Sequence, residues 1–287
     1  MYALSFAVRT DLADEARRLR QRDAAAETAL PGVEAGEERL FGLPVYTVEV
    51  RSEEGARRLG KPRGRYHTLS LPQHFERGAE DFGGAVRALA ELLRRCIPGR
   101  IEQVLVAALG NPDITPDALG SLAAGSILVT RHLKQGGNPD FAGFCSLALC
   151  RPGVLGTSGM ESALQIATLC RELRPGLVIA IDALAGAEAA RLCRTVQITD
   201  TGICPGSGVG NDRMELSAST LGVPVVAVGV PTVIDAGLFG GAELASMFVT
   251  PRGIDSLVRA AGRVIGYAVN LAVHPGIDIG DVDALLG

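Results

Sequence analysis

The sequence lacks a long uninterrupted apolar run. Its longest apolar stretch, residues 221–234, contains two glycines and two prolines and is shorter than the roughly 20 residues that a membrane-spanning helix requires. Residues 1–7 are apolar but have no basic region before them and no small-residue cleavage pattern after them, unlike a secretory signal. We therefore expect no membrane partner and place the chain in the cytoplasm of a cell.

Paired cysteines, clustered histidines and basic stripes are also absent. The six cysteines include no Cys-x-x-Cys pair and lie mostly in apolar segments, and the four histidines are scattered. This pattern is typical of reduced core thiols rather than disulfides or zinc sites. The formal net charge is −4 with dispersed basic residues, which argues against direct contact with nucleic acid. We expect neither a metal nor another cofactor.

Strand and helix patterns alternate along most of the chain. Apolar runs predict strands at residues 104–109, near 147, and at 177–181, 195–199 and 223–230, and helices are expected at 117–124, 159–173, directly after residue 182, and from 251 onward. Such alternation predicts an α/β/α sandwich of three layers around a largely parallel sheet. Residues 12–75 differ in composition and contain strand candidates at 44–50 and 65–71, so we expect an N-terminal β elaboration of one catalytic domain spanning residues 1–287.

Two apolar runs are each followed by an aspartate. Asp182 directly follows the run at 177–181, and Asp117 lies in a Thr-Pro-Asp-Ala-Leu-Gly segment beyond the run at 104–109. Open α/β sheets place ligands at the carboxyl ends of such strands. Paired carboxylates suffice for hydrolysis, since the ionised one activates water while its protonated neighbour polarises the amide. The alternative is that each aspartate only caps a helix.

A glycine-rich loop follows the strand candidate at 195–199. The residues Gly206, Ser207, Gly208, Gly210 and Asn211 fit neither a dinucleotide fingerprint nor a Walker loop. They predict a tight loop whose backbone N–H groups steady an oxyanion or bind substrate. A non-catalytic anion-binding module and a plain structural turn are the alternatives.

Cys204 lies in the same loop. A cysteine hydrolase is therefore a further alternative, with His132 as the candidate base.

Long segments of the chain resemble the germination protease (spore protease) family of spore-forming bacteria, endopeptidases that degrade small acid-soluble spore proteins during germination. The matching segments are residues 8–13, 60–66, 108–111, 115–120, 129–133, 152–159, 179–185, 200–211 and 229–236. The resemblance implies an endopeptidase with a fold similar to that of hydrogenase-maturation proteases, with Asp117 and Asp182 as catalytic residues. It also implies a homo-oligomer, a tetramer in the family, that acts in the forespore or spore core.

The same resemblance bears on the N-terminus. Family members are made as precursors that trim themselves, and they cut after an acidic residue within a segment that Thr-Asp-Leu-Ala-Asp-Glu at residues 10–15 resembles. We therefore expect residues 1–11 to be a propeptide and the chain to be cut between Asp11 and Leu12. Two departures are visible: Cys204 stands where the family loop usually has histidine, and the segment between residues 236 and 250 is shorter.

Overall fold

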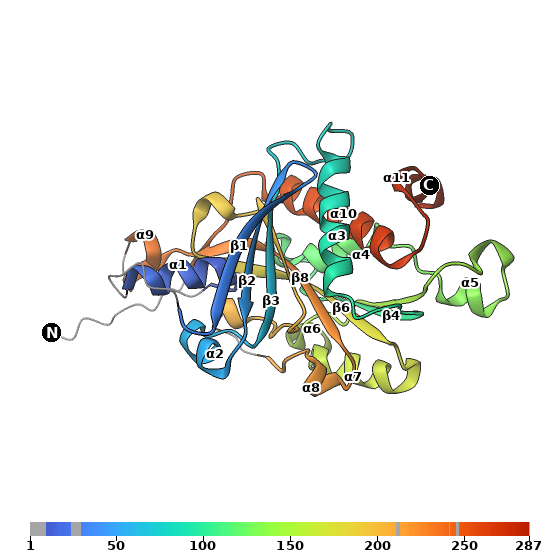
Figure 1. Cartoon of the computed structure of the whole chain (residues 1–287), viewed down its shortest axis with the longest axis horizontal. Coiled ribbons are helices and arrows are strands. Elements are labelled where there is room, and N and C mark those ends of the chain that lie inside the picture. The colour runs from blue at the N-terminus through green and yellow to red at the C-terminus, as the bar shows by residue number, and fades with distance from the viewer. Residues whose placement is uncertain (1–9, 24–29, 211–212, 241, 245–246, 287) are drawn as a thin grey trace.

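The sheet of this protein runs through the whole molecule (Figure 1). The computed structural model describes residues 10–23, 30–210, 213–240, 242–244 and 247–286. Within these residues nine strands form one sheet in the order β1-β2-β3-β7-β8-β6-β4-β5, with β9 paired to β8.

The central part of the sheet is parallel, as the alternating pattern predicts. Strand β4 lies between β5 and β6, and β6 lies between β4 and β8, all in parallel register. These strands span Gln103–Ala108 (β4), Ser146–Cys150 (β5), Leu177–Gly186 (β6) and Val225–Asp235 (β8). Residues of β6 alternate between the two faces, and those from Leu177 to Ile181 are all fully buried. Burial of such aliphatic side chains stabilises the fold by about 1.5–3 kcal/mol each.

The N-terminal strands extend the same sheet in antiparallel fashion. Strand β7 pairs antiparallel with β8, and β3, β2 and β1 follow it outward, each antiparallel to the one before. They span Thr195–Thr199 (β7), Gly64–Ser70 (β3), Leu43–Val50 (β2) and Val33–Leu40 (β1), and the two-residue β9 spans Phe248–Val249. The predicted β elaboration is therefore the antiparallel half of one mixed sheet.

Helices cover both faces, which confirms the three-layer sandwich. On one face pack α3 (Phe82–Cys96), α4 (Leu119–Ala124) and α10 (Ile254–Val273). On the other lie α7 (Ser162–Leu173) and α8 (Ala218–Leu221) beside the parallel strands, and α1 (Ala13–Asp23) and α2 (Glu53–Leu59) beside the antiparallel ones. The peripheral helices are α5 (Arg131–Gln135), α6 (Leu155–Ser158), α9 (Gly237–Gly240) and α11 (Ile279–Leu286). No helix of the described residues has the length and apolar content needed to cross a membrane.

One local prediction is wrong. The sequence analysis expects a helix directly after Asp182, but β6 continues through that residue to Gly186 because β8 remains paired with it, opposite Gly229 at this point. Asp182 therefore caps no helix and lies inside a strand.

Candidate active site

Asp182 lies on β6 at the point where the neighbouring strand β4 ends. Strand β4 stops at Ala108, which pairs with Ile181, and the chain turns away after Leu109, whose N–H donates to the Ile181 carbonyl at 2.8 Å. Beyond this point β6 keeps β8 on one side and has lost β4 on the other. Asp182 is the first residue of β6 that has no partner on β4, and it is 4% exposed.

Asp117 is delivered by the loop that leaves β4. Residues Thr115–Asp117 form a short 3-10 helix before α4, and Asp117 Oδ2 accepts the backbone N–H of Asn111 at 2.8 Å. The loop passes Gly110, whose φ is +90° and whose Cβ, if present, would lie 2.0 Å from the Asp117 carbonyl oxygen. A side chain at residue 110 is therefore excluded while Asp117 holds this position. Asp117 does not cap α4, since that helix has no side-chain cap.

Both aspartates line one cavity of about 470 Å³ at the carboxyl edge of the parallel strands. Apolar side chains of Ile114, Leu155 and Phe248 form part of its wall. The location agrees with the rule that open α/β sheets bind ligands where the strands end.

The two carboxyl groups are electrostatically unequal. Burial raises the pKa of Asp182 well above its ordinary value of 3.8, the negative charge of Asp117 raises it further, and the N–H of Ala183 partly opposes both effects. Burial also raises the pKa of Asp117, but the Asn111 N–H opposes that shift by favouring the ionised form. Both pKa values are therefore raised, that of Asp182 more strongly, so Asp182 is the carboxyl group that keeps its proton more readily and Asp117 is the one that ionises first. Such a difference divides acid and base roles between two carboxyl groups.

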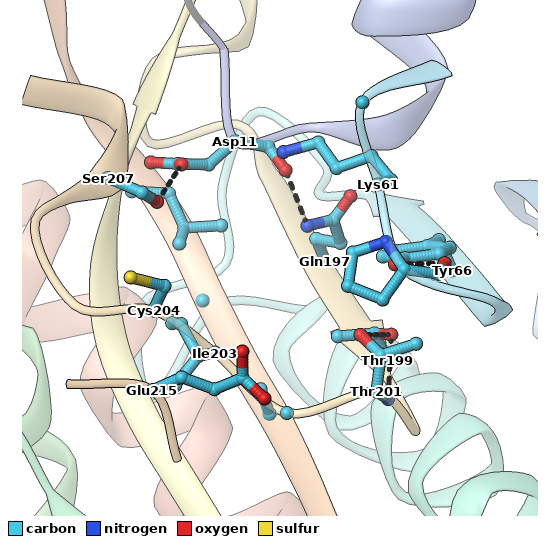
Figure 2. A pocket seen from close by; sticks show the side chains of 16 residues that line it. Asp11, Lys61, Tyr66, Gln197, Thr199, Thr201, Ile203, Cys204, Ser207 and Glu215 are labelled. Atoms are coloured by element: carbon cyan, nitrogen blue, oxygen red, sulfur yellow. Dashed lines mark hydrogen bonds between the residues drawn. The ribbon is translucent and has the colours of Figure 1, made fainter. Parts of the chain in front are cut away.

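The glycine-rich loop reaches this cavity in part. Gly206 and Gly208 line it. Gly210 is exposed and is absent from the described lining, and its N–H already donates to the Ser207 carbonyl at 3.2 Å. Ser207 turns to a second cavity, of about 210 Å³ (Figure 2). Asn211 lies outside the described residues.

Asp11 separates the two cavities and lines both. Its carboxylate accepts a hydrogen bond from Ser207 Oγ at 2.9 Å, as Figure 2 shows, and another from the Ala185 N–H at 2.8 Å. Leu12 is fully buried. Of the expected propeptide, residues 1–9 lie outside the described part of the chain, whereas the junction at residues 11 and 12 is firmly held.

Cys204 and His132 are far apart in the fold. Cys204 follows β7, where its Sγ donates to the Arg213 carbonyl at 3.1 Å. His132 is exposed on α5, which packs on β5, and strands β8, β6 and β4 separate β5 from β7. Figure 1 shows α5 at the end of the molecule away from α1. The pairing that the cysteine hydrolase alternative requires is therefore not formed.

Several cavity residues were missed by the sequence analysis. Arg213 and Glu161 form an ion pair of 3.7 Å at the cavity wall, and Thr250 Oγ1 is buried there without a hydrogen-bond partner among the described residues. These side chains come from unrelated segments with no motif of their own, so only the folded arrangement reveals them. Across the described part of the chain, no three His, Cys, Asp or Glu side chains form a group that could hold a metal ion.

The chain is similar to known proteins over almost its whole length. A family model described as germination protease matches residues 10–245. Similar sequences include the germination proteases of Caldanaerobacter subterraneus subsp. tengcongensis (35% identity; 97% of this chain, 98% of that one) and Oceanobacillus iheyensis (40%; 81% and 65%). Among solved structures, the [NiFe] hydrogenase maturation protease HycI from Thermococcus kodakarensis matches with a TM-score of 0.37 and 18% identity, covering 63% of this chain and 98% of that chain.

Proposed function

The chain belongs to the germination protease family, and from this premise we propose that it is an endopeptidase whose Asp117 and Asp182 hydrolyse small acid-soluble spore proteins. The observation that carries the proposal is the shared cavity, in which the charge of Asp117 raises the pKa of Asp182. Two carboxyl groups that influence each other in one cavity, one favoured as acid and one as base, are what water activation requires.

The proposed reaction begins with a water molecule between the carboxyl groups. Asp117, ionised, takes a proton from the water as its oxygen attacks the carbonyl carbon of the substrate. Asp182, protonated, donates its proton to the carbonyl oxygen. When the tetrahedral intermediate collapses, the C–N bond breaks, the leaving nitrogen takes the proton from Asp117, and Asp182 takes back the proton of the hydroxyl group that becomes the carbonyl, so both carboxyl groups regain their starting states. Gly206 and Gly208 border the same cavity, and their backbone groups are the candidates for steadying the oxyanion.

We extend the proposal to the cellular location, the oligomeric state and the cofactor requirement. The substrate would be encountered in the cytoplasm of the forespore or spore core, and the active protein would be a homo-oligomer, a tetramer as in the family. No direct contact with nucleic acid and no cofactor are part of the mechanism.

The test is cleavage of a purified acid-soluble spore protein by the full-length chain. Hydrolysis should disappear in Asp117→Asn and Asp182→Asn and persist in Cys204→Ala. Loss only in Cys204→Ala would support the cysteine hydrolase instead. Absence of cleavage by the intact chain under all conditions, together with anion binding at the glycine-rich loop, would support the non-catalytic module.

Self-processing between Asp11 and Leu12 remains part of the proposal. Gln197 holds both sides of this peptide bond, since its Nε2 donates to the Asp11 carbonyl at 3.0 Å and its Oε1 accepts the Ala13 N–H at 2.8 Å. These two hydrogen bonds fix the position of the bond that is proposed to be cut. Mass spectrometry of the chain held at mildly acidic pH should find a new N-terminus at Leu12, and a new N-terminus elsewhere, or an intact chain, would contradict it.

A further inference from the structure

The segment at residues 10–13 lies against the end of β6 as a bound peptide would. The Asp11 N–H donates to the Ala185 carbonyl at 2.9 Å, and Gln197 holds the backbone on the opposite side. Backbone pairing to the exposed edge of a strand is a common way in which proteins bind extended peptides. Here the edge of β6 is unpaired on one side because the pairing with β4 ends at Ile181.

The side chain of Asp11 enters a site built for a carboxylate. Each of its oxygens accepts one hydrogen bond, Oδ2 from the Ala185 N–H at 2.8 Å and Oδ1 from Ser207 Oγ at 2.9 Å. Figure 2 shows this carboxylate on the Ser207 side of the segment, with Lys61 and Gln197 on the other. Hydrogen bonds to a charged acceptor are stronger than those between neutral groups. An apolar side chain in place of Asp11 could not accept them.

Gly208 leaves the room that this carboxylate needs. A Cβ at residue 208 would lie 2.1 Å from Asp11 Oδ2 and 2.6 Å from the Ala185 Cβ. The loop therefore approaches the β6 edge so closely that only glycine fits while the acid is bound. This close approach gives Gly208 a role besides lining the cavity.

Lys61 lies on the other side of the same segment. Its Nζ donates to the Thr10 carbonyl at 3.1 Å. Burial lowers the pKa of Lys61, and the negative charges of Asp11 and Glu15 oppose that shift. An acidic side chain bound beside Ser207 therefore favours the charged form of the lysine.

This carboxylate site adjoins the aspartate pair. Ala185 and Asp182 lie on the same strand, three residues apart, and Asp11 lines the cavity of Asp117 and Asp182 as well as the second cavity. A peptide that paired with the end of β6 as residues 10–13 do would thus carry its acidic side chain next to the proposed reacting groups.

We propose that the Ala185 N–H and Ser207 Oγ are the groups that recognise an aspartate or glutamate side chain of the substrate, and that Asp11 occupies this subsite in cis. The proposal rests on the proposed endopeptidase function, and Ser207 is its specificity-determining side chain. The segment and a substrate compete for one place, so the acidic residue of a substrate enters when residues 10–13 have left.

A first experiment tests the carboxylate site without relying on hydrolysis. Asp11→Gly leaves a vacancy of the size of acetate in the full-length chain, and acetate should raise its melting temperature more than the uncharged, similarly shaped acetamide does. The difference should disappear in Asp11→Gly combined with Ser207→Ala and should be absent from the wild type, whose site is filled. Equal effects of acetate and acetamide on Asp11→Gly would overturn the proposal.

A second experiment tests specificity in the reaction. A cleaved acid-soluble spore protein is compared with a version in which the acidic residue nearest each cut is replaced by its amide, glutamate by glutamine or aspartate by asparagine. The amide should lower kcat/KM about tenfold in the wild type, in keeping with the loss of a hydrogen bond to a charged group, and less than about threefold in Ser207→Ala. Ser256→Ala, an exposed serine that bonds only within its own turn at Gly253, is the matched control and should keep the wild-type ratio.

The outcomes separate the two proposals. Cleavage that depends on Asp117 and Asp182 but does not discriminate acid from amide overturns the subsite and leaves the endopeptidase standing. Selective binding of acetate to Asp11→Gly, without cleavage of any spore protein, supports the carboxylate site and contradicts the proposed function.

Discussion

Replacing Asp182 by asparagine should inactivate the protein and stabilise its fold. The side chain is 4% exposed and interacts with the charge of Asp117, so its ionised form is unfavourable in the folded chain. Asparagine has nearly the same shape and keeps an oxygen that can accept the Ala183 N–H, which Asp182 Oδ1 accepts at 3.0 Å. The variant therefore removes the ionisation without opening a cavity.

The stability gain should depend on pH in a defined direction. A carboxyl group whose pKa is raised by folding binds its proton more tightly in the folded state, so its contribution to stability falls as the pH rises above the unfolded value, near 3.8. Asp182→Asn should therefore match the wild type in stability near pH 3 and exceed it increasingly until the pH passes the folded pKa. Each pKa unit of the shift contributes about 1.4 kcal/mol to the plateau, so the plateau measures the shift directly.

Urea unfolding of both proteins between pH 3 and pH 9, together with hydrolysis rates, would provide the measurement. The activity should fall by about 10²- to 10⁴-fold, the usual contribution of a positioned acid or base. In an Asp117→Asn background the gain from Asp182→Asn should be smaller, because the charge that raises the pKa of Asp182 is gone. An Asp182→Asn variant that is less stable than the wild type at pH 8, or that retains full activity, would refute the reasoning.

Three further predictions concern single side chains. Gly110→Ala should lower stability by about 2 kcal/mol or more and reduce activity in parallel, because φ is +90° and the new Cβ would meet the Asp117 carbonyl; a retained rate at normal stability would contradict it. Cys204→Ala should change the rate less than about threefold, since general acid–base work is assigned to the aspartates, and peptide hydrolysis measures this directly. Arg191→Met should destabilise the fold by about 2 kcal/mol in thermal unfolding, because the buried carboxylate of Asp14 loses its 2.5 Å contact with Arg191 and keeps only the ion pair with Arg18; unchanged unfolding would show the Arg191 ion pair to be dispensable.

The parallel centre of the sheet and its helices were readable from the sequence because their signals are local. Strands buried on both faces appear as unbroken aliphatic runs, and residues 177–181 and 104–108 fit that description in the structure. The run at 104–109 also ends close to the end of β4, at Ala108, and the run at 177–181 ends where β6 loses its pairing with β4, which is the edge at which the two aspartates lie. The helix expected after Asp182 does not form, because a local signal carries no information about pairing with a distant strand. An Asp-Ala-Leu sequence suits a helix start, but pairing with β8 overrides that preference.

The glycine-rich loop shows a different limit of sequence reasoning. The glycines predict a tight loop, but they do not indicate which of their N–H groups remain available to bind a ligand. Gly210 donates within the loop, while Gly208 is required by a close approach to Asp11. That partner lies about 200 residues away in the chain, and no spacing rule connects the two.

By itself the sequence determined the layer architecture and the positions of the buried strands, and it singled out two aspartates as candidates, because hydrophobic periodicity is a property of contiguous residues. The tertiary structure alone decided that Asp117 and Asp182 influence each other, that Cys204 and His132 do not meet, and that Asp11 fills a carboxylate site between two cavities. These facts depend on where β4 ends relative to β6 and on how the N-terminal segment packs against that edge. Pairing between distant segments is set by the free energy of the whole fold, and that free energy has no signature in any single stretch of the chain.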